Sequence, residues 1–415
     1  MRNPRKKIVF VFFVWGEEYI ERLCNLLLKN IDIEISESPK LFNKFDIIFK
    51  FYTTQESFQE IQNNFIKYKH LNKFCNLKIK EFDKLRKYFD RKNKYKLLGS
   101  LQTISIIDNI SSDYIFFLYP DFLFKIGSIK NILKNLKDYD IFYTYCPQVI
   151  EEEILKQINT NSFNYVLKNF EKIILKYLHP IVKACELDTK RFNHASNLSI
   201  IKKDHAIFKN FHLHPTLIKI SVKNRELFKS SNISFDEDFF DFAVDKNLKI
   251  YYPKNSDEMM FCSLFERDAI LLPKVKMTHL NVATWILQNA YPIHYKNVSN
   301  TFTLKTKNND RNEVKKSISR IENFVETVLN YINKNDLFDR IYYRKDPLFV
   351  IASLNSKKRN LFYKKENILN YHDKSIDNIF SKNKYLTKKN FKNLYLRELK
   401  NLDMSVYESI SNFIN

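Results

Sequence analysis

The sequence has very little glycine, few cysteines and none of the short motifs that mark the commonest nucleotide-binding and hydrolytic sites. Its 415 residues include 3 glycines, 5 cysteines and 10 prolines. It contains no GxGxxG, GxxxxGK[ST], HExxH or GxSxG segment. These absences argue against Rossmann oxidoreductases, P-loop NTPases, zinc proteases of the HExxH type and α/β hydrolases.

The cysteines are odd in number, widely spaced and never arranged as CxxC. This pattern suggests neither a disulfide framework nor a zinc site, and it fits a reducing cytosol. A basic start, MRNPRKK, precedes the apolar run IVFVFFVW, which resembles part of a signal peptide. The apolar run has only eight residues and is followed by Gly16, Glu17 and Glu18. We therefore predict a buried first strand, and no run reaches the roughly 18 apolar residues that a membrane span needs.

The chain is strongly basic, with a formal net charge of +22 and 44% hydrophobic residues. The hydrophobic content is sufficient for a sizeable core. Two interpretations of the charge stay open. A coding bias that enriches Lys, Asn, Ile, Phe and Tyr would raise the lysine content without any functional demand. Alternatively, the charge attracts an anionic partner such as nucleotide phosphates, an acidic membrane surface or nucleic acid.

Strands and helices are predicted to alternate in the first third of the chain. Strands are expected at 8–14, 46–53, 77–82 and 114–119. Helices are expected from Glu17 onward and at 55–68 and 92–110. The first helix has Tyr19, Ile20, Leu23 and Leu27 on one face. Such alternation is typical of βαβ units and a mainly parallel sheet flanked by helices, an α/β fold. In such sheets ligands bind beyond the carboxyl ends of the strands.

The pattern changes after residue 130. We predict helices at 131–137 and 313–332, two further helices within 151–178, an outer strand at 140–146, extended segments at 194–205 and 211–222, and strands at 248–253 and 270–279. Apolar residues at helical spacing continue to the end, so 346–415 is interpreted as helical. The expected division is a first domain of residues 1–295 and a helical C-terminal extension of 296–415.

The three glycines, Gly16, Gly99 and Gly127, all fall in segments that border the same predicted sheet edge. A chain this poor in glycine should keep one mainly where no side chain fits, and a glycine inside the helix at 92–110 costs about 1 kcal/mol relative to alanine. Ordinary turns and a tolerated helical glycine are the alternative explanation.

A single carboxylate follows the fourth predicted strand, in SSDYIFFLYPDFLF. Asp121 beyond a strand end can hold a divalent cation that in turn binds a diphosphate, and Pro120 stiffens the approach. Asp121 can equally cap the following turn.

Other polar groups suggest chemistry less strongly. Asp236, Glu237 and Asp238 begin a predicted helix, where acids suit the helix dipole but can also supply a general base. His212 and His214 form an HxH pair that can bind a metal or remain a buried hydrogen-bonded pair. Asp257 and Glu258 follow the strand at 248–253, and His279 and His294 are further candidates of this kind.

Four segments together resemble the GT-A-fold glycosyltransferases of bacterial surface-polysaccharide type, over roughly residues 8–295. VFFVWGEEYIERL is similar to the family's opening strand and nucleotide-binding helix, and YPDFLFKIGS to its DxD segment. FDEDF is similar to the xED segment that supplies a catalytic base, and THLNV to the late metal-binding histidine.

The resemblance implies a role for each matching residue. Asp121 and His279 would hold Mn²⁺ or Mg²⁺ on a nucleotide diphosphate, and Asp238 would be the base, with Glu237 or Asp236 positioning the acceptor. Trp15 and Gly16 would border the nucleotide, Thr53 and Thr54 would meet its base or ribose, and Gly99 would lie near the same site.

One departure matters, because the DxD position reads Tyr119-Pro120-Asp121 and lacks its first acid. Metal binding is then weaker, or lysines such as Lys94, Lys96 or Lys125 hold the diphosphate instead. The expected partners are a nucleotide-sugar donor and a saccharide or lipid-linked acceptor, with peripheral contact with an anionic membrane, in the cytoplasm. A non-catalytic binding protein on the same scaffold is the main alternative. A basic nucleic-acid-binding protein is a further one, but no nucleic-acid partner is expected.

Overall fold

The computed structural model describes residues 4–86, 94–189, 197–210, 213–220, 249–268, 277–279, 282 and 300–334. Its main feature is a seven-stranded sheet with the order β11-β6-β10-β4-β1-β2-β3. The strands are β1 (Lys6–Phe13), β2 (Phe45–Thr53), β3 (Cys75–Glu81), β4 (Tyr114–Leu118), β6 (Ile141–Thr144), β10 (His214–Lys219) and β11 (Ile250–Tyr251). Only β10 runs antiparallel to its neighbours. The predicted α/β class with a mainly parallel sheet flanked by helices is therefore confirmed.

Strand β1 shows why the sheet lies in the centre of the molecule. Its side chains alternate between two separate apolar clusters, with Ile8, Phe10 and Phe12 in one and Val9, Val11 and Phe13 in the other. Alternate residues of a strand point to opposite faces, so a strand that is apolar throughout must be covered on both. The ring of Phe10 stacks on Phe116 of β4, with centroids 4.6 Å apart.

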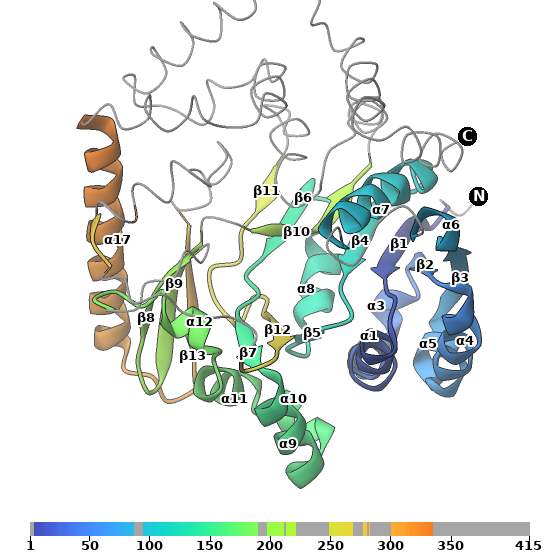
Figure 1. Ribbon diagram of the computed structural model, residues 1–415, viewed down its shortest axis with the longest axis horizontal. Helices are drawn as coiled ribbons and strands as arrows, with labels where there is room; N and C mark the ends of the chain where they lie inside the picture. Colours follow the sequence, from blue (N-terminus) through green and yellow to red (C-terminus); the bar gives the residue numbers. More distant parts are fainter. Residues whose placement is uncertain are drawn as a thin grey trace, which may run out of the picture.

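Helices cover both faces of this sheet (Figure 1). One face packs on α1 (Glu17–Arg22), the π-helical η1 (Leu23–Leu27), α2 (Leu28–Glu37), α3 (Pro39–Phe42), α4 (Phe58–Lys67), α5 (Lys69–Phe74) and α8 (Ser128–Asn135). The other face packs on α7 (Lys94–Asp108), and the short helices η2 (Gln55–Ser57) and α6 (Asp83–Arg86) follow β2 and β3. Tyr19, which we expected on the apolar face of the first helix, is 40% exposed. The buried stripe instead runs through Ile20, Leu23 and Leu27.

Two smaller sheets extend the fold. One has the order β5-β12-β7 and the other β13-β9-β8. Their strands are β5 (Phe122–Phe124), β7 (Gln148–Ile150), β8 (Asn197–Ile201), β9 (His205–Asn210), β12 (Phe261–Phe265) and β13 (Thr301–Lys305). Around them lie α9 (Glu151–Asn161), α10 (Phe163–Lys168), α11 (Phe170–Lys176), α12 (Pro180–Lys183) and α17 (Arg311–Lys334). Three helices therefore occupy 151–176 where two were predicted.

The predicted helix at 313–332 is confirmed by α17, which contacts β8 and β9 at the end of the molecule opposite α4 and α5 (Figure 1). The expected division at residues 295 and 296 stays a prediction. Residues 301–305 form strand β13, which pairs with β9, so this part of the expected extension is not helical. The predicted helix at 346–415 lies outside the described residues, as does most of the predicted strand at 270–279. Within the described part of the chain, no helix is long and apolar enough to cross a membrane.

Candidate active site

The strand order reverses between β1 and β4, the position at which open α/β sheets form a crevice. From β1 the chain proceeds to β2 and β3 on one side, and β4 then joins β1 on the other side. In open parallel sheets, ligands bind outside the carboxyl ends of the strands where the direction of progress reverses in this way. Trp15 and Gly16 follow β1 at this point, and Pro120 and Asp121 follow β4. The predicted nucleotide-binding and carboxylate segments therefore flank the same crevice.

Asp121 is partly buried and held by the small sheet beside it. Its Oδ2 atom accepts a hydrogen bond from Ser263 Oγ at 2.5 Å, and its backbone oxygen accepts one from the Leu264 amide at 2.8 Å. Burial raises the pKa of the Cys146 and Cys262 thiols, and the negative charge of Asp121 raises both further.

Gly16 is where the chain turns from β1 into α1. Its φ of 85° and ψ of 138° lie in a region that side-chain-bearing residues rarely adopt. A methyl group added there would meet no atom within 4 Å. The backbone conformation therefore requires glycine, and the space beside it is open. Trp15 is half-buried, and its ring and that of Phe82 form a T-shaped pair with centroids 5.5 Å apart.

The two threonines at the end of β2 are buried, Thr53 at 0% and Thr54 at 1% exposure. Thr54 Oγ1 lies 3.2 Å from both Glu56 Oε1 and Ser57 Oγ. Thr53 Oγ1 has no hydrogen-bond partner within the described residues. The predicted contact of these threonines with the base or ribose stays a prediction.

Gly99 lies buried in α7, one turn before Gln102. Gln102 is fully buried, and its Nε2 donates to the Tyr119 hydroxyl at 2.9 Å. Helix α7 is thereby linked to the residue that leads from β4 to Pro120 and Asp121. The predicted role of Gly99 near the nucleotide stays a prediction.

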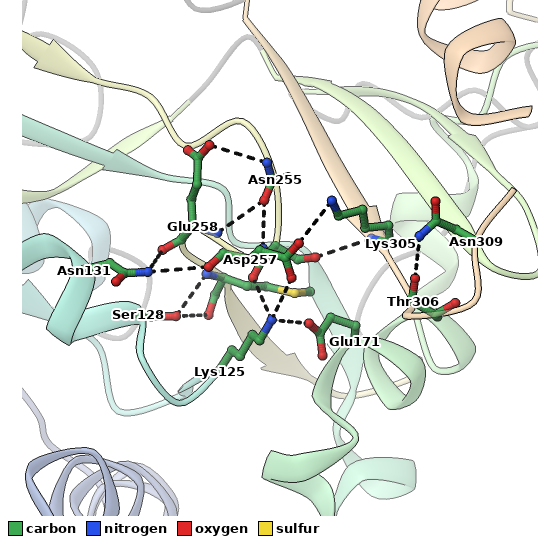
Figure 2. Close-up of polar contacts among 12 residues, drawn as sticks. Lys125, Ser128, Asn131, Glu171, Asn255, Asp257, Glu258, Lys305, Thr306 and Asn309 are labelled. Atoms are coloured by element: carbon green, nitrogen blue, oxygen red, sulfur yellow. Dashed lines mark hydrogen bonds and ion pairs between the residues drawn. The ribbon is translucent and has the colours of Figure 1, made fainter. Parts of the chain in front are cut away.

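Lys125, one of the alternative diphosphate ligands, is already paired. Its Nζ forms ion pairs with Glu171 and, at 3.2 Å, with Asp257 (Figure 2). Asp257 also pairs with Lys305 at 3.1 Å. Burial raises the pKa of Asp257, but the two lysines outweigh it and lower that pKa overall. The ion pair between Asp257 and Lys125 thus links the segment after β11 to the segment after β5. The side chains of the other two candidate lysines, Lys94 and Lys96, lie outside what the structure describes.

The candidate base and the second metal ligand are less defined. Asp236, Glu237, Asp238 and His212 lie outside the described residues. His279 is described, and its ring stacks on Phe324 of α17 with centroids 4.3 Å apart. No group of three or more His, Cys, Asp or Glu side chains in the described ranges is placed to hold a metal ion. The metal role of Asp121 and His279 stays a prediction.

Ser263 and the strand that carries it were not predicted from the sequence. The segment FCSLF forms β12, which places Ser263 opposite Phe122 and next to Asp121. Its content of bulky apolar residues is the one signal in the sequence for a strand there. The partner of Ser263 lies far away along the chain, so no local pattern could have found this contact.

Comparisons with known proteins give only distant matches. No protein-family model matches the chain, and no curated protein matches its sequence. Among solved structures, TarS of S. aureus matches with a TM-score of 0.28 and 11% identity over 92% of this chain, which spans 54% of that protein's length. TarS 1-349 in complex with UDP-GlcNAc matches with a TM-score of 0.28 and 12% identity, over 95% of this chain and 92% of that one. Mouse xyloside xylosyltransferase 1 matches with a TM-score of 0.22 and 8% identity, over 38% of this chain and 59% of that one. Values this low support no conclusion about fold or activity.

Proposed function

We propose that the chain is a GT-A-like glycosyltransferase that moves a sugar from a nucleotide-sugar donor to a saccharide or lipid-linked acceptor. The observation that supports this most is the position of Asp121. It follows β4 on one side of the crevice, and Trp15 and Gly16 follow β1 on the other. The crevice is where an α/β sheet binds nucleotides, and a carboxylate there suits the metal-diphosphate part of such a ligand.

The chemistry needs a group that binds the diphosphate and a group that takes a proton. We assign the first role to Asp121 and the second to Asp238, with Glu237 and Asp236 positioning the acceptor. The acceptor hydroxyl loses its proton to the base as its oxygen bonds to the anomeric carbon of the donor sugar. The bond from that carbon to the diphosphate oxygen breaks, and its electron pair leaves with the nucleoside diphosphate.

The described residues suit a divalent cation only in part. Asp121 offers the hard oxygen ligand that Mn²⁺ and Mg²⁺ prefer, so most of the remaining ligands would come from the diphosphate and water. When bound, the cation neutralises charge on the leaving diphosphate. The half-buried Trp15 offers an aromatic surface beside the same crevice.

A nucleotide-binding screen tests this proposal. We expect UDP, GDP, CDP, CMP or one of their sugars to raise the melting temperature in the presence of Mn²⁺. A ligand at about 100 times its dissociation constant stabilises by roughly 2.7 kcal/mol. Asp121→Asn should abolish the Mn²⁺-dependent part of the shift, because the amide lacks the charge that holds the cation.

Ser263→Ala is the matched control for Asp121→Asn. It removes the hydrogen bond between these side chains but keeps the carboxylate. It should cost about 1 kcal/mol of stability and leave nucleotide binding intact. Equal nucleotide shifts in wild type and Asp121→Asn would contradict the role of Asp121, and no shift with any nucleotide would contradict the proposed function.

The single acid in Tyr119-Pro120-Asp121 favours a second candidate, a non-catalytic protein that binds a nucleotide sugar on the same scaffold. The two candidates differ in turnover. A transferase releases nucleoside diphosphate from its donor, slowly to water and faster with an acceptor, whereas a binding protein shows the thermal shift without release. Coupled detection of the released diphosphate separates them.

A further inference from the structure

A pocket of about 430 Å³ lies away from Asp121, between the segment that follows β11, strand β13 and helix α17. Its volume is in the range of small-molecule sites. It is lined by Tyr252, Pro253, Lys254, Asn255, Asn300, Thr301, Thr303, Lys305, Val314 and Ile318. Strand β11 is parallel to β6 and β4, so the segment after it emerges at the same sheet edge as Asp121.

The lining combines two kinds of surface. Asn255, Thr303 and Lys305 contribute amide, hydroxyl and ammonium groups, whereas Pro253 and Ile318 are apolar. A sugar ring has the matching character, since its C–H faces are apolar and its edge carries hydroxyl groups. Lys305 and Asn255 already bond to Asp257 and Glu258, and they can share these groups with the hydroxyls of a sugar. A small ion would leave most of the volume empty.

A second, much smaller cavity adjoins the pocket. Its volume is about 20 Å³, enough for one water-sized group, and four of its lining residues, Tyr252, Pro253, Asn300 and Thr301, also line the large pocket. Tyr145 lines the small cavity, and its ring stacks on those of Phe208 and Phe302, with ring centroids 4.5 and 4.9 Å away. Tyr145 is 2% exposed, and its hydroxyl has no hydrogen-bond partner in the described part of the chain.

An unpaired buried hydroxyl is costly, so an aromatic cluster that retains one points to a partner that arrives from outside. We propose that the large pocket binds a saccharide, the acceptor of the transfer proposed above, with one ring hydroxyl or hydroxymethyl group in the small cavity bonded to Tyr145. Tyr145 then selects sugars by the position of that group. The acceptor role rests on the proposed function, whereas saccharide binding by this pocket does not.

Ligand-observed NMR on the full chain tests this directly. The probes are the methyl α- and β-pyranosides of glucose, galactose, mannose, N-acetylglucosamine and N-acetylgalactosamine. We expect saturation transfer from the protein to at least one of them. Ile318→Trp should abolish it, because the larger side chain projects into the pocket and obstructs a sugar ring. Ser319→Trp places the same side chain on the exposed neighbouring position of α17 and should leave the signal unchanged.

Tyr145→Phe tests the hydroxyl alone. It should raise the dissociation constant of the bound glycoside about 3- to 10-fold, the usual effect of losing one hydrogen bond. The melting temperature of the free protein should not fall, because the variant removes an unpaired group from a packed cluster. A role in packing alone would leave glycoside affinity unchanged.

The outcomes keep this inference separate from the proposed function. If Ile318→Trp keeps the nucleotide-induced thermal shift but loses glycoside binding, the proposed function and the pocket assignment are both supported. Glycoside binding that survives Ile318→Trp, or no transfer to any probe in the wild type, overturns the pocket assignment even if nucleotides bind. Absence of nucleotide binding in the wild type would overturn the proposed donor site. It would not change the conclusion drawn from glycoside binding.

Discussion

At the scale of single residues, buried carboxylates in this protein have separate tasks. Asp121 is partly buried at the crevice, whereas Glu34 is 1% exposed and accepts hydrogen bonds from the Gly127 and Lys130 amides at 2.5 and 2.8 Å. These amides belong to the first turn of α8, which has no other side-chain cap. Glu34 therefore satisfies helix-end donors from a neighbouring helix, a task that none of its sequence neighbours reveals.

Glu34 should also make stability depend on pH. Burial raises its pKa above the ordinary value of 4.5, although the two amide hydrogen bonds act in the opposite direction. The folded protein thus holds this proton more tightly than the unfolded chain does. The contribution of Glu34 to the free energy of unfolding is complete below the pKa that Glu34 has in the unfolded chain. It is lost as pH rises through the pKa of Glu34 in the folded protein.

Glu34→Gln cannot titrate, so we expect the stability advantage of wild type over this variant to shrink between pH 4.5 and 7.5. Urea unfolding at both pH values measures the difference. Glu21→Gln, at an exposed position of α1, is the control and should show no such trend. An advantage that grows with pH would contradict the assigned direction of the shift.

At the scale of elements, two glycines that precede different helices show similar backbone demands. Gly127 precedes α8 with a φ of 96°, and Gly16 precedes α1 with a φ of 85°. An added methyl group meets no atom within 4 Å at either position. The cost of alanine is therefore the backbone conformation itself, roughly 1–3 kcal/mol at each site.

Only one of these glycines borders the proposed nucleotide crevice. We expect Gly16→Ala and Gly127→Ala both to lower the melting temperature. Gly16→Ala should in addition reduce the nucleotide-induced shift, because the methyl group projects into the open space beside the crevice. Identical nucleotide shifts in the two variants would place the nucleotide away from Gly16.

The long regular elements could be predicted from the sequence, and the short ones could not. The strands that became β1, β2 and β4 are dense in β-branched and aromatic residues, and β3 alternates Leu77 and Ile79 with lysines. All four alternate with apolar-periodic helices, so local pattern and fold agree. Strands β5 and β7 have three residues each, too few to show a period. Asp121 could be predicted because it follows the apolar strand β4, whereas the partners of Ser263 and Tyr145 lie far away in sequence.

At the scale of the whole molecule, the excess of positive charge is the feature that local structure explains least. The formal net charge is +22, and among the described residues ion pairs such as Lys125 with Asp257 involve only some of the lysines. A transferase with a lipid-linked acceptor works at a membrane surface, and the cytoplasmic leaflet carries anionic lipid. Each lysine or arginine near such a surface contributes roughly 1 kcal/mol of attraction.

We therefore expect the full chain to sediment with phosphatidylglycerol-containing vesicles at low salt and not with pure phosphatidylcholine vesicles. The attraction is electrostatic, and the screening length falls from about 10 Å at 0.1 M salt to about 3 Å at 1 M. Raising the salt should therefore release the protein. Co-sedimentation that persists at 1 M salt would indicate apolar insertion instead. Equal behaviour with both lipids at low salt would mean that the lysine content reflects composition and not a membrane partner.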